Sequence, residues 1–326
     1  MKKSLLIFLV LIMFARAEGQ ESLKDLSLKL VASCHSDKEK VARIFQWVTS
    51  NISYRVSYKN IRSSVNADFD ANEDEEDTSA LKPLNERVAE RVFKTRLAVC
   101  DGYSRLLATM CEYAEIPAAV IIGYGRPGSG RPRSFGVNHY WNAVYFEGQW
   151  HLLDATWASG YIIESSREFV RSYSARYFLT DPAVFINDHY PDDQRWTLLD
   201  EPVLFPELKR SPFKQKSFRK YNISEIYPSK GVLETYVGDT LRFELITSNP
   251  IRDKNILPDL LVDSSLFDHS NSWVFLKPDK DLSSYPLSSK FSYSYPVQSE
   301  SVEWIYLQYN EDIVLRYRVK TKRKDL

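Results

Sequence analysis

The sequence predicts an α+β protein built from two successive units. Helical and strand-like apolar patterns alternate as far as residue 205, whereas beyond Pro206 short strand-like runs recur without helical periodicity. The chain has 326 residues, of which 44% are hydrophobic and 26% are charged. This composition is typical of a folded globular protein, with length for about two domains. Three cysteines are too few for a disulfide framework.

The overall charge gives no reason to expect nucleic-acid binding. Lys and Arg together number 43, as do Asp and Glu, so the formal net charge is zero. A nucleic-acid-binding protein concentrates a basic surplus on one face. The basic run at 320–324 is expected to be a solvated tail.

The first 17 residues have the three parts of a secretory signal peptide. Lys2 and Lys3 give a basic start, an apolar run follows at 4–14, and the small residues Ala15 and Ala17 suit cleavage after Ala17. The apolar run is too short to span a bilayer, and no later run approaches the roughly 18 residues that a span needs. The sequence therefore predicts a signal peptide at 1–17 and a secreted or periplasmic protein without a membrane span.

Apolar spacing predicts four helices in the first unit, at 22–33, 36–52, 87–93 and 100–114. The second begins at Ser36, because Ser36 and Glu39 have the spacing of a capping box, in which the hydroxyl and the carboxylate each bind a backbone N–H. Apolar residues then recur at helical spacing from Val41 to Ile52. This spacing gives the second helix one apolar face.

An acidic stretch at 67–78 has almost nothing to bury and is expected to be an exposed loop. Its residues 68–72 look like the beginning of a calcium-binding loop. Glu73 stands where such a loop needs Gly, however, and Ser79 stands where it needs Glu. We therefore expect a solvated loop, and the sequence predicts neither a metal ion nor any other cofactor.

The clearest strand signal is a β-hairpin with strands at 139–146 and 149–156 and a turn at Glu147-Gly148. An apolar run at 118–122 predicts a buried strand before it. The segment at 126–136, which contains Gly, Pro and Arg, is expected to be a mobile loop between this strand and the hairpin.

Six strand-like runs rich in Tyr, Val, Leu and Ile follow Pro206, at 232–236, 241–246, 273–276, 291–295, 302–309 and 313–319. Clusters of Pro, Ser, Asn and Asp separate them. Short strands divided by turn residues are typical of a β-sandwich of immunoglobulin-like type. The expected organisation is a signal peptide at 1–17, a first unit at 18–205 and a β-sandwich at 206–326.

Cys100 is placed to act as a nucleophile. It begins the helix predicted at 100–114, and the free N–H groups and dipole at a helix N-terminus stabilise a thiolate. The thiolate is the form of cysteine that attacks carbonyl groups. The alternative for any single cysteine is packing as a small apolar residue, which suits Cys111 inside the same helix.

The hairpin brings His139 and Asp154 to one face. With a two-residue turn, paired residue numbers sum to 295, so His139 lies opposite Thr156. Residues two apart on a strand share a face, so Asp154 points to the same side as His139 and His151 points away. A bulge or a three-residue loop would reverse this placement. An imidazole oriented by a carboxylate and aimed at a thiol is the arrangement that activates a cysteine nucleophile.

Several segments resemble the transglutaminase-like superfamily: KVARIFQWVTSNISY at 40–54, AVCDGYSRLLATMCEYAEIPAAVIIGYG at 98–125 and NHYWNAVYFEGQWHLLDATW at 138–157. The segment YFLTDPAVFINDHYPDDQRWTLL at 177–199 is similar to the kyphoscoliosis-peptidase branch, whose bacterial members are secreted. The resemblance implies a papain-like α+β fold, often followed by an immunoglobulin-like domain. It also implies a catalytic triad in which Cys100 is the nucleophile, His139 the base and Asp154 the residue that orients the base.

The chain departs from animal transglutaminases at the oxyanion site. Those enzymes use a Trp upstream of the nucleophile to hold the oxyanion, and here the nearest upstream Trp is Trp47, on an earlier helix. The backbone N–H of Cys100 could be one donor, and Gln46, Trp47 or Tyr54 could be the second. Asn142 and Trp157 recur with the family motif, where they orient the strands that carry the triad or simply pack.

The sequence thus predicts a secreted cysteine-nucleophile enzyme that acts on peptide or side-chain amides through an acyl-enzyme, as a peptidase or amidase. The expected substrate is a protein, a peptide or cell-wall material. Two alternatives stay open: a transglutaminase that cross-links proteins, and a non-catalytic module that binds a protein or cell-wall partner. Cys34 and Cys111 could form a disulfide in an oxidising compartment, which would leave Cys100 free.

Overall fold

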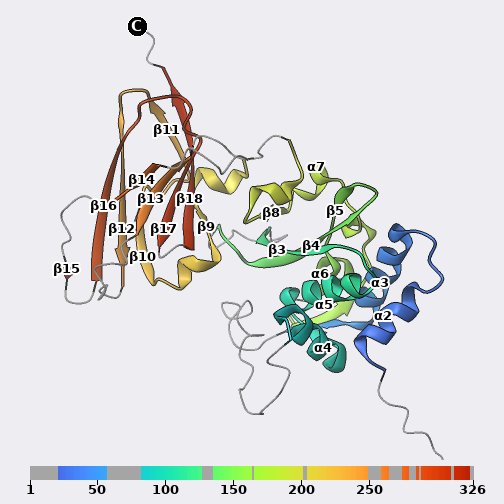
Figure 1. Ribbon diagram of the computed structural model, residues 1–326. Coiled ribbons are helices and arrows are strands. Elements are labelled where there is room, and N and C mark those ends of the chain that lie inside the picture. Colours follow the sequence, from blue (N-terminus) through green and yellow to red (C-terminus); the bar gives the residue numbers. More distant parts are fainter. Residues whose placement is uncertain are drawn as a thin grey trace, which may run out of the picture.

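The structure is a computed structural model that describes residues 21–56, 82–126, 135–163, 165–200, 204–248, 258–263, 274–278, 284–285, 288–309 and 312–323. The expected signal peptide at 1–17, the acidic loop at 67–78 and most of the loop at 126–136 lie outside these residues. Figure 1 shows a part made of helices and a sheet beside a part made mostly of strands. Within the described ranges, no helix is long and apolar enough to cross a membrane.

All four predicted helices are present: α2 (Leu23–Val31), α3 (Asp37–Asn51), α4 (Leu84–Thr95) and α5 (Cys100–Tyr113). Ser36 caps α3, since its hydroxyl accepts a hydrogen bond of 3.2 Å from the backbone N–H of Glu39. The Glu39 carboxylate accepts from the N–H of His35, 2.7 Å away, one residue earlier than a capping box predicts. Apolar residues of all four helices share one buried cluster.

The helix α5 lies between the other helices and a four-stranded antiparallel sheet (Figure 1). The strand order is β5-β4-β3-β8, with bounds β3 (Ala118–Gly125), β4 (His139–Phe146), β5 (Gln149–Leu153) and β8 (His189–Pro191). Every residue of α5 from Cys100 to Cys111 is buried. Asn142 Nδ2 of β4 donates a 2.9 Å hydrogen bond to the Ser104 carbonyl of α5. This bond fixes the sheet against the helix.

The predicted register of the hairpin is confirmed. Residues 147 and 148 both have positive φ, 51° and 81°, as a two-residue hairpin turn requires. Paired residue numbers sum to 295 along the whole ladder between β4 and β5. The second strand ends at Leu153 instead of the predicted Thr156, because Asp154 caps a short helix, α6 (Ala155–Ser159).

Shorter elements complete the first unit: the parallel pair β1 (Ser53–Tyr54) and β2 (Leu97–Ala98), the hairpin β6 (Gly160–Ile163) and β7 (Glu168–Arg171), the helix α7 (Pro182–Phe185), and the 3₁₀ helices η3 (Ala175–Tyr177) and η4 (Gln194–Thr197). Two more 3₁₀ helices, η5 (Pro206–Lys209) and η6 (Lys216–Arg219), lead into the second unit.

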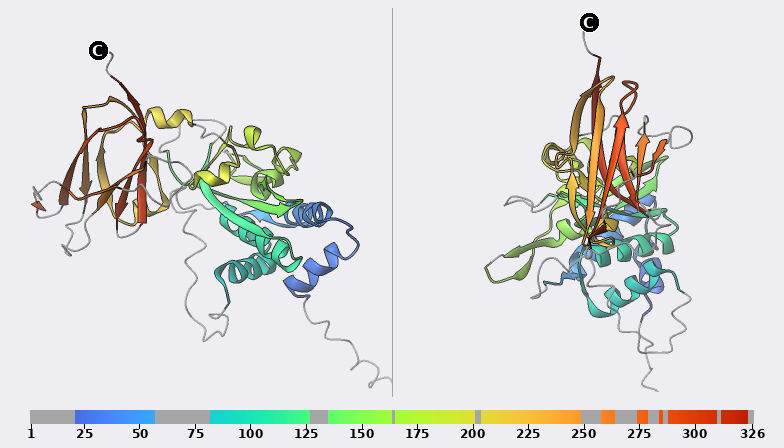
Figure 2. Two further views of the ribbon diagram at one scale, coloured as in Figure 1. Left: turned by 45° about the horizontal axis from the view of Figure 1, so that its top comes forward. Right: turned by 90° about the vertical axis from the view of Figure 1, so that its left-hand side faces the viewer.

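After Pro206 the chain forms two sheets packed face to face (Figure 2). One sheet contains β10 (Ile223–Tyr227), β12 (Thr240–Thr247), β16 (Ser288–Pro296) and β15 (Ser284–Tyr285). The other contains β11 (Val232–Tyr236), β18 (Asp312–Lys322), β17 (Trp304–Tyr309), β13 (Asp259–Asp263) and β14 (Val274–Leu276), with β9 (Phe213–Lys214) beside β18. The sheet-rich second unit is thus confirmed. Its immunoglobulin-like type and the boundary at 205/206 stay predictions.

The basic run at 320–324 is not a free tail over its whole length. Lys320 and Lys322 belong to β18, where they pair with Glu234 and Tyr236 of β11 in a parallel ladder. The prediction of a solvated tail was wrong for these residues, because backbone hydrogen bonds to the neighbouring strand hold them in the sheet.

An apolar cluster that includes Phe213 and Trp304 joins the two units. Within it, Arg316 of β18 is 2% exposed, and its guanidinium lies 4.3 Å from the ring centroid of Phe213. Arg316 donates to the Pro191 carbonyl at 2.9 Å and also to the Asp192 carbonyl, at the end of β8. The sheet of the first unit is therefore tied directly to the second unit.

Replacing Arg316 with Leu is expected to lower the free energy of unfolding by about 3 kcal/mol, because the buried Pro191 carbonyl and the partly buried Asp192 carbonyl lose their charged donor. Chemical denaturation of the full chain measures this loss. Arg323→Leu is the control, since the Arg323 side chain is 81% exposed, and its effect should stay within about 0.5 kcal/mol. Equal losses in the two variants would contradict the role given to Arg316.

Candidate active site

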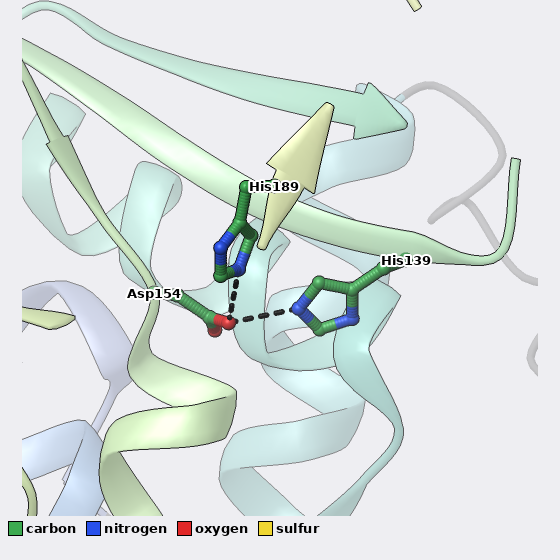
Figure 3. Close-up of side chains that lie close together, drawn as sticks. All are labelled: His139, Asp154 and His189. Atoms are coloured by element: carbon green, nitrogen blue, oxygen red, sulfur yellow. Dashed lines mark hydrogen bonds and ion pairs between the residues drawn. The ribbon is translucent and has the colours of Figure 1, made fainter. Parts of the chain in front are cut away.

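The buried carboxylate of Asp154 joins three elements. It is the N-cap of α6, where its Oδ1 accepts backbone hydrogen bonds from Thr156 at 2.7 Å and from Trp157 at 3.2 Å. Its Oδ2 lies 2.8 Å from His139 Nε2 and 3.1 Å from His189 Nε2 (Figure 3). The same carboxylate therefore begins a helix with one oxygen and orients two imidazoles with the other.

The charges of Asp154 and His139 stabilise each other. Burial by itself raises the pKa of Asp154, but the charge of His139 and the hydrogen bonds from His139 and His189 hold that pKa well below its usual range. Burial lowers the pKa of His139, but the charge and hydrogen bond of Asp154, with a further hydrogen bond involving Cys100, raise it to about 9. At neutral pH the pair is thus an imidazolium beside a carboxylate.

Cys100 is the third member of the site. It is the first residue of α5 and is 6% exposed, and no side chain caps this end of the helix. Its thiol interacts with the imidazole, since a hydrogen bond between them is among the causes that raise the pKa of His139. Because Nε2 of the ring faces Asp154, Nδ1 is the nitrogen that the thiol can reach. The structure thus brings together the three residues that the sequence predicts as a triad.

Close packing by Trp157 and Gly125 holds the His139 ring. The Trp157 ring stacks on it, with ring centroids 4.8 Å apart and an interplanar angle of 26°. Gly125 of β3 lies against both residues: a Cβ atom at this position would come within 3.0 Å of His139 Cβ and 2.9 Å of the Trp157 ring. A glycine at 125 is therefore required for the observed position of the imidazole.

His151 and the two remaining cysteines, Cys34 and Cys111, lie outside the site. His151 points away from the site and stacks on Phe146, with centroids 4.0 Å apart, as the strand parity predicts. Cys111 is buried inside α5, and burial raises the pKa of its thiol far above the usual value, so it packs as an apolar residue.

All three cysteines are free thiols, so the disulfide considered between Cys34 and Cys111 is not formed. Cys111 lies within the core, whereas Cys34 is only half-buried after α2.

Comparison with known proteins shows which family the first unit resembles. Residues 24–155 match the family model of the transglutaminase-like superfamily. The kyphoscoliosis peptidase of Mus musculus is 32% identical over 222 residues, which are 67% of this chain and 31% of that protein. The chain carries a transglutaminase-like domain. The predicted fold class, an α+β transglutaminase core followed by a sheet-rich unit, is thereby confirmed.

Two further similarities extend the comparison. The kyphoscoliosis peptidase of Homo sapiens is 30% identical over 227 residues, 69% of this chain and 31% of that protein. A solved structure described as that of a TGase is 21% identical and covers 48% of this chain and 34% of its own, with a TM-score of 0.28. The chain spans about a third of the length of the two curated relatives.

The sequence pattern did not single out His189 and Asp188 of the transglutaminase-like domain. His189 is fully buried at the start of β8, and its Nδ1 lies 2.7 Å from Asp188 Oδ1. One signal could have found them, because both lie in the segment 177–199 that resembles the kyphoscoliosis-peptidase branch. Their distance in sequence from Asp154 hid their contact with it.

The structure separates the three candidates for a second oxyanion donor in this domain. Gln46 is exposed on α3. Trp47 packs on Phe93, with ring centroids 6.1 Å apart. Burial is the main cause that raises the pKa of the Tyr54 hydroxyl, and the charge of Cys100 is the next cause. The effect of that charge indicates that Tyr54 is close to Cys100. The position of Tyr54 therefore suits an oxyanion donor best.

The His139, Asp154 and His189 side chains are also of the types that bind metal ions. Their ligand atoms all lie within 4.8 Å of one another. Hydrogen bonds of 2.8 and 3.1 Å join these atoms directly, however, whereas ligands of a tetrahedral zinc ion with bonds of 2.0 Å lie about 3.3 Å apart. The distances favour a hydrogen-bonded group over a metal centre.

We expect the His139 imidazole to titrate near pH 9 and its midpoint to fall in Asp154→Asn, because the carboxylate raises the pKa. Since the folded-state pKa lies above the unfolded value of about 6.5, the ion pair stabilises the fold below that pH and loses its effect as the pH rises through about 9. NMR titration of the imidazole measures the midpoint, with His151→Gln used to assign signals. A wild-type midpoint at or below 6.5 would contradict the ion pair.

Proposed function

We propose that the protein is a cysteine-nucleophile enzyme that cleaves amide bonds in proteins or peptides through an acyl-enzyme, as a peptidase or amidase. The observation that carries this proposal is the order Cys100, His139, Asp154, in which a thiol at a helix N-terminus meets an imidazole that a buried carboxylate holds. That order is what nucleophilic catalysis by cysteine requires. This order suits acyl transfer to water and to an amine alike, and the name of the two relatives, kyphoscoliosis peptidase, favours hydrolysis.

Before the proposed first half-reaction, the Cys100 thiol gives its proton to His139, and the resulting thiolate sulfur then attacks the carbonyl carbon of the substrate. The raised pKa of His139 favours this transfer. The backbone N–H of Cys100 and the hydroxyl of Tyr54 stabilise the oxyanion that forms. When the C–N bond breaks, the His139 imidazolium gives its proton to the leaving nitrogen, and a thioester stays on Cys100.

In the second half-reaction, a water molecule gives a proton to His139 and attacks the thioester carbonyl. The C–S bond breaks, a carboxylic acid leaves and the thiol is restored. An amine in place of water would yield a new amide and a cross-linking transglutaminase. We further propose that the enzyme is exported, on the basis of the signal-peptide pattern at 1–17, so that its substrates are proteins, peptides or cell-wall material outside the cytoplasm.

Wild type and Cys100→Ala should differ sharply when each is incubated with casein, peptidoglycan fragments or casein plus a fluorescent amine. We expect release of new amino groups from one of the first two substrates, and at least about a 10³-fold loss of that activity in Cys100→Ala. Cys34→Ala is the control, because Cys34 is half-buried and outside the site, and its activity should stay within about twofold of wild type.

The other outcomes of this experiment identify the alternatives. Incorporation of the amine without hydrolysis would replace the peptidase by a cross-linking transglutaminase. No difference between wild type and Cys100→Ala in any assay would contradict an enzyme and indicate a binding module.

A further inference from the structure

The imidazole of His189 shares the Asp154 oxygen with His139. His189 is 1% exposed and begins β8, where it pairs with Gly125 of β3. Its Nε2 lies 3.1 Å from Asp154 Oδ2, and its Nδ1 lies 2.7 Å from Asp188 Oδ1. Figure 3 shows the carboxylate of Asp154 with one imidazole on each of two sides. Both ring nitrogens of His189 therefore face carboxylate oxygens.

Both of these carboxylates are placed to be ionised. Asp154 accepts two backbone N–H groups of α6 in addition to the imidazoles. Asp188 Oδ2 accepts from Arg176 Nη2 at 2.9 Å and from the Tyr177 hydroxyl at 3.3 Å. An ionised carboxylate can only accept hydrogen bonds, so each ring nitrogen that faces one has to carry a proton. An imidazole with protons on both nitrogens is positively charged.

The surroundings of the His189 ring also favour a positive charge. Phe185 of α7 stacks on the ring, with centroids 4.0 Å apart and an interplanar angle of 24°. The face of an aromatic ring attracts a cation. Burial lowers the pKa of His189, but hydrogen bonds to Asp154 and Asp188 outweigh burial and raise the pKa above its usual value.

We propose that His189 is a positioning residue that stays protonated. Asp188 holds the His189 ring, and the ring in turn fixes the Asp154 carboxylate and offsets part of its negative charge. This inference rests on the proposed function of Cys100 and His139. The ring centroids of His189 and His139 are 5.4 Å apart, so two positive charges there repel each other. The charge on His189 therefore limits how strongly Asp154 holds the proton on His139, which His139 has to release to the leaving nitrogen.

Nitrogen NMR of the labelled full chain tests the charge on His189 without any substrate. We expect both ring nitrogens of His189 to carry protons between about pH 6 and pH 8, with His189→Gln used to assign the signals. A neutral ring with one unprotonated nitrogen would overturn the proposal. One tightly bound metal ion per chain, measured by mass spectrometry of metals, would overturn it too, because the ion would replace the proton on Nε2.

The variant His189→Gln tests the effect on His139. Glutamine can still donate a hydrogen bond to Asp154, but it carries no charge, so the midpoint of His139 should rise by about one pH unit. Asp188→Asn removes the carboxylate that keeps His189 protonated, so the ring should stay in place but lose its charge, and the His139 midpoint should again rise. This variant provides the test if His189→Gln does not fold. The control is His151→Gln, which removes an imidazole that points away from the site and should leave the midpoint unchanged.

An unchanged or lowered His139 midpoint in both His189→Gln and Asp188→Asn would overturn the proposal. Where activity is measurable, the alkaline limb of kcat/KM should move to higher pH in His189→Gln, and a purely structural role for His189 would reduce activity without moving that limb. Failure of the proposed function is distinguishable from failure of this inference. An inactive wild type would contradict the enzyme, but the NMR results would still decide the charge on His189.

Discussion

The candidate active site in the first unit depends on the hydrogen bonds of one buried carboxylate, that of Asp154. An isolated ion at this depth would cost several kcal/mol, and here two backbone N–H groups and two imidazoles offset that cost. The same hydrogen bonds explain the local fold. They end β5 at Leu153 and start α6 immediately afterwards, so a single side chain sets the strand end, the helix start and the direction of His139.

Charges of alternating sign extend from this carboxylate in both directions. His139 lies toward Cys100, and His189 lies toward Asp188, whose other oxygen binds an arginine. Each of the two imidazolium rings has an anion on either side when the Cys100 thiol is ionised, so neither buried positive charge is left unpaired. Secondary structure holds this series in place, because α5, β4 and β8 each contribute one of its members.

The sequence predicted those features that depend on local patterns. The hairpin register followed from a two-residue turn and strand parity, and it correctly placed His139 and Asp154 on one side. It could not show that Asp154 leaves the strand to cap a helix, since that outcome depends on buried partners. His189 was missed because a three-residue strand carries no periodicity and its contact with Asp154 spans 35 residues. The hydrogen bond from Arg316 to the Pro191 carbonyl, at the end of β8, spans 125 residues and was missed for the same reason.

We propose that the Asp154 carboxylate, acting through His139, makes Cys100 a reactive nucleophile. The rate at which iodoacetamide alkylates each cysteine at pH 6, followed by peptide mass spectrometry in wild type and Asp154→Asn, tests it most directly. We expect fast alkylation of Cys100 in wild type, and a rate at least about tenfold lower in the variant, with Cys34 slow in both proteins. Equally slow alkylation of Cys100 and Cys34 in wild type, or an unchanged Cys100 rate in Asp154→Asn, would contradict this role of Asp154.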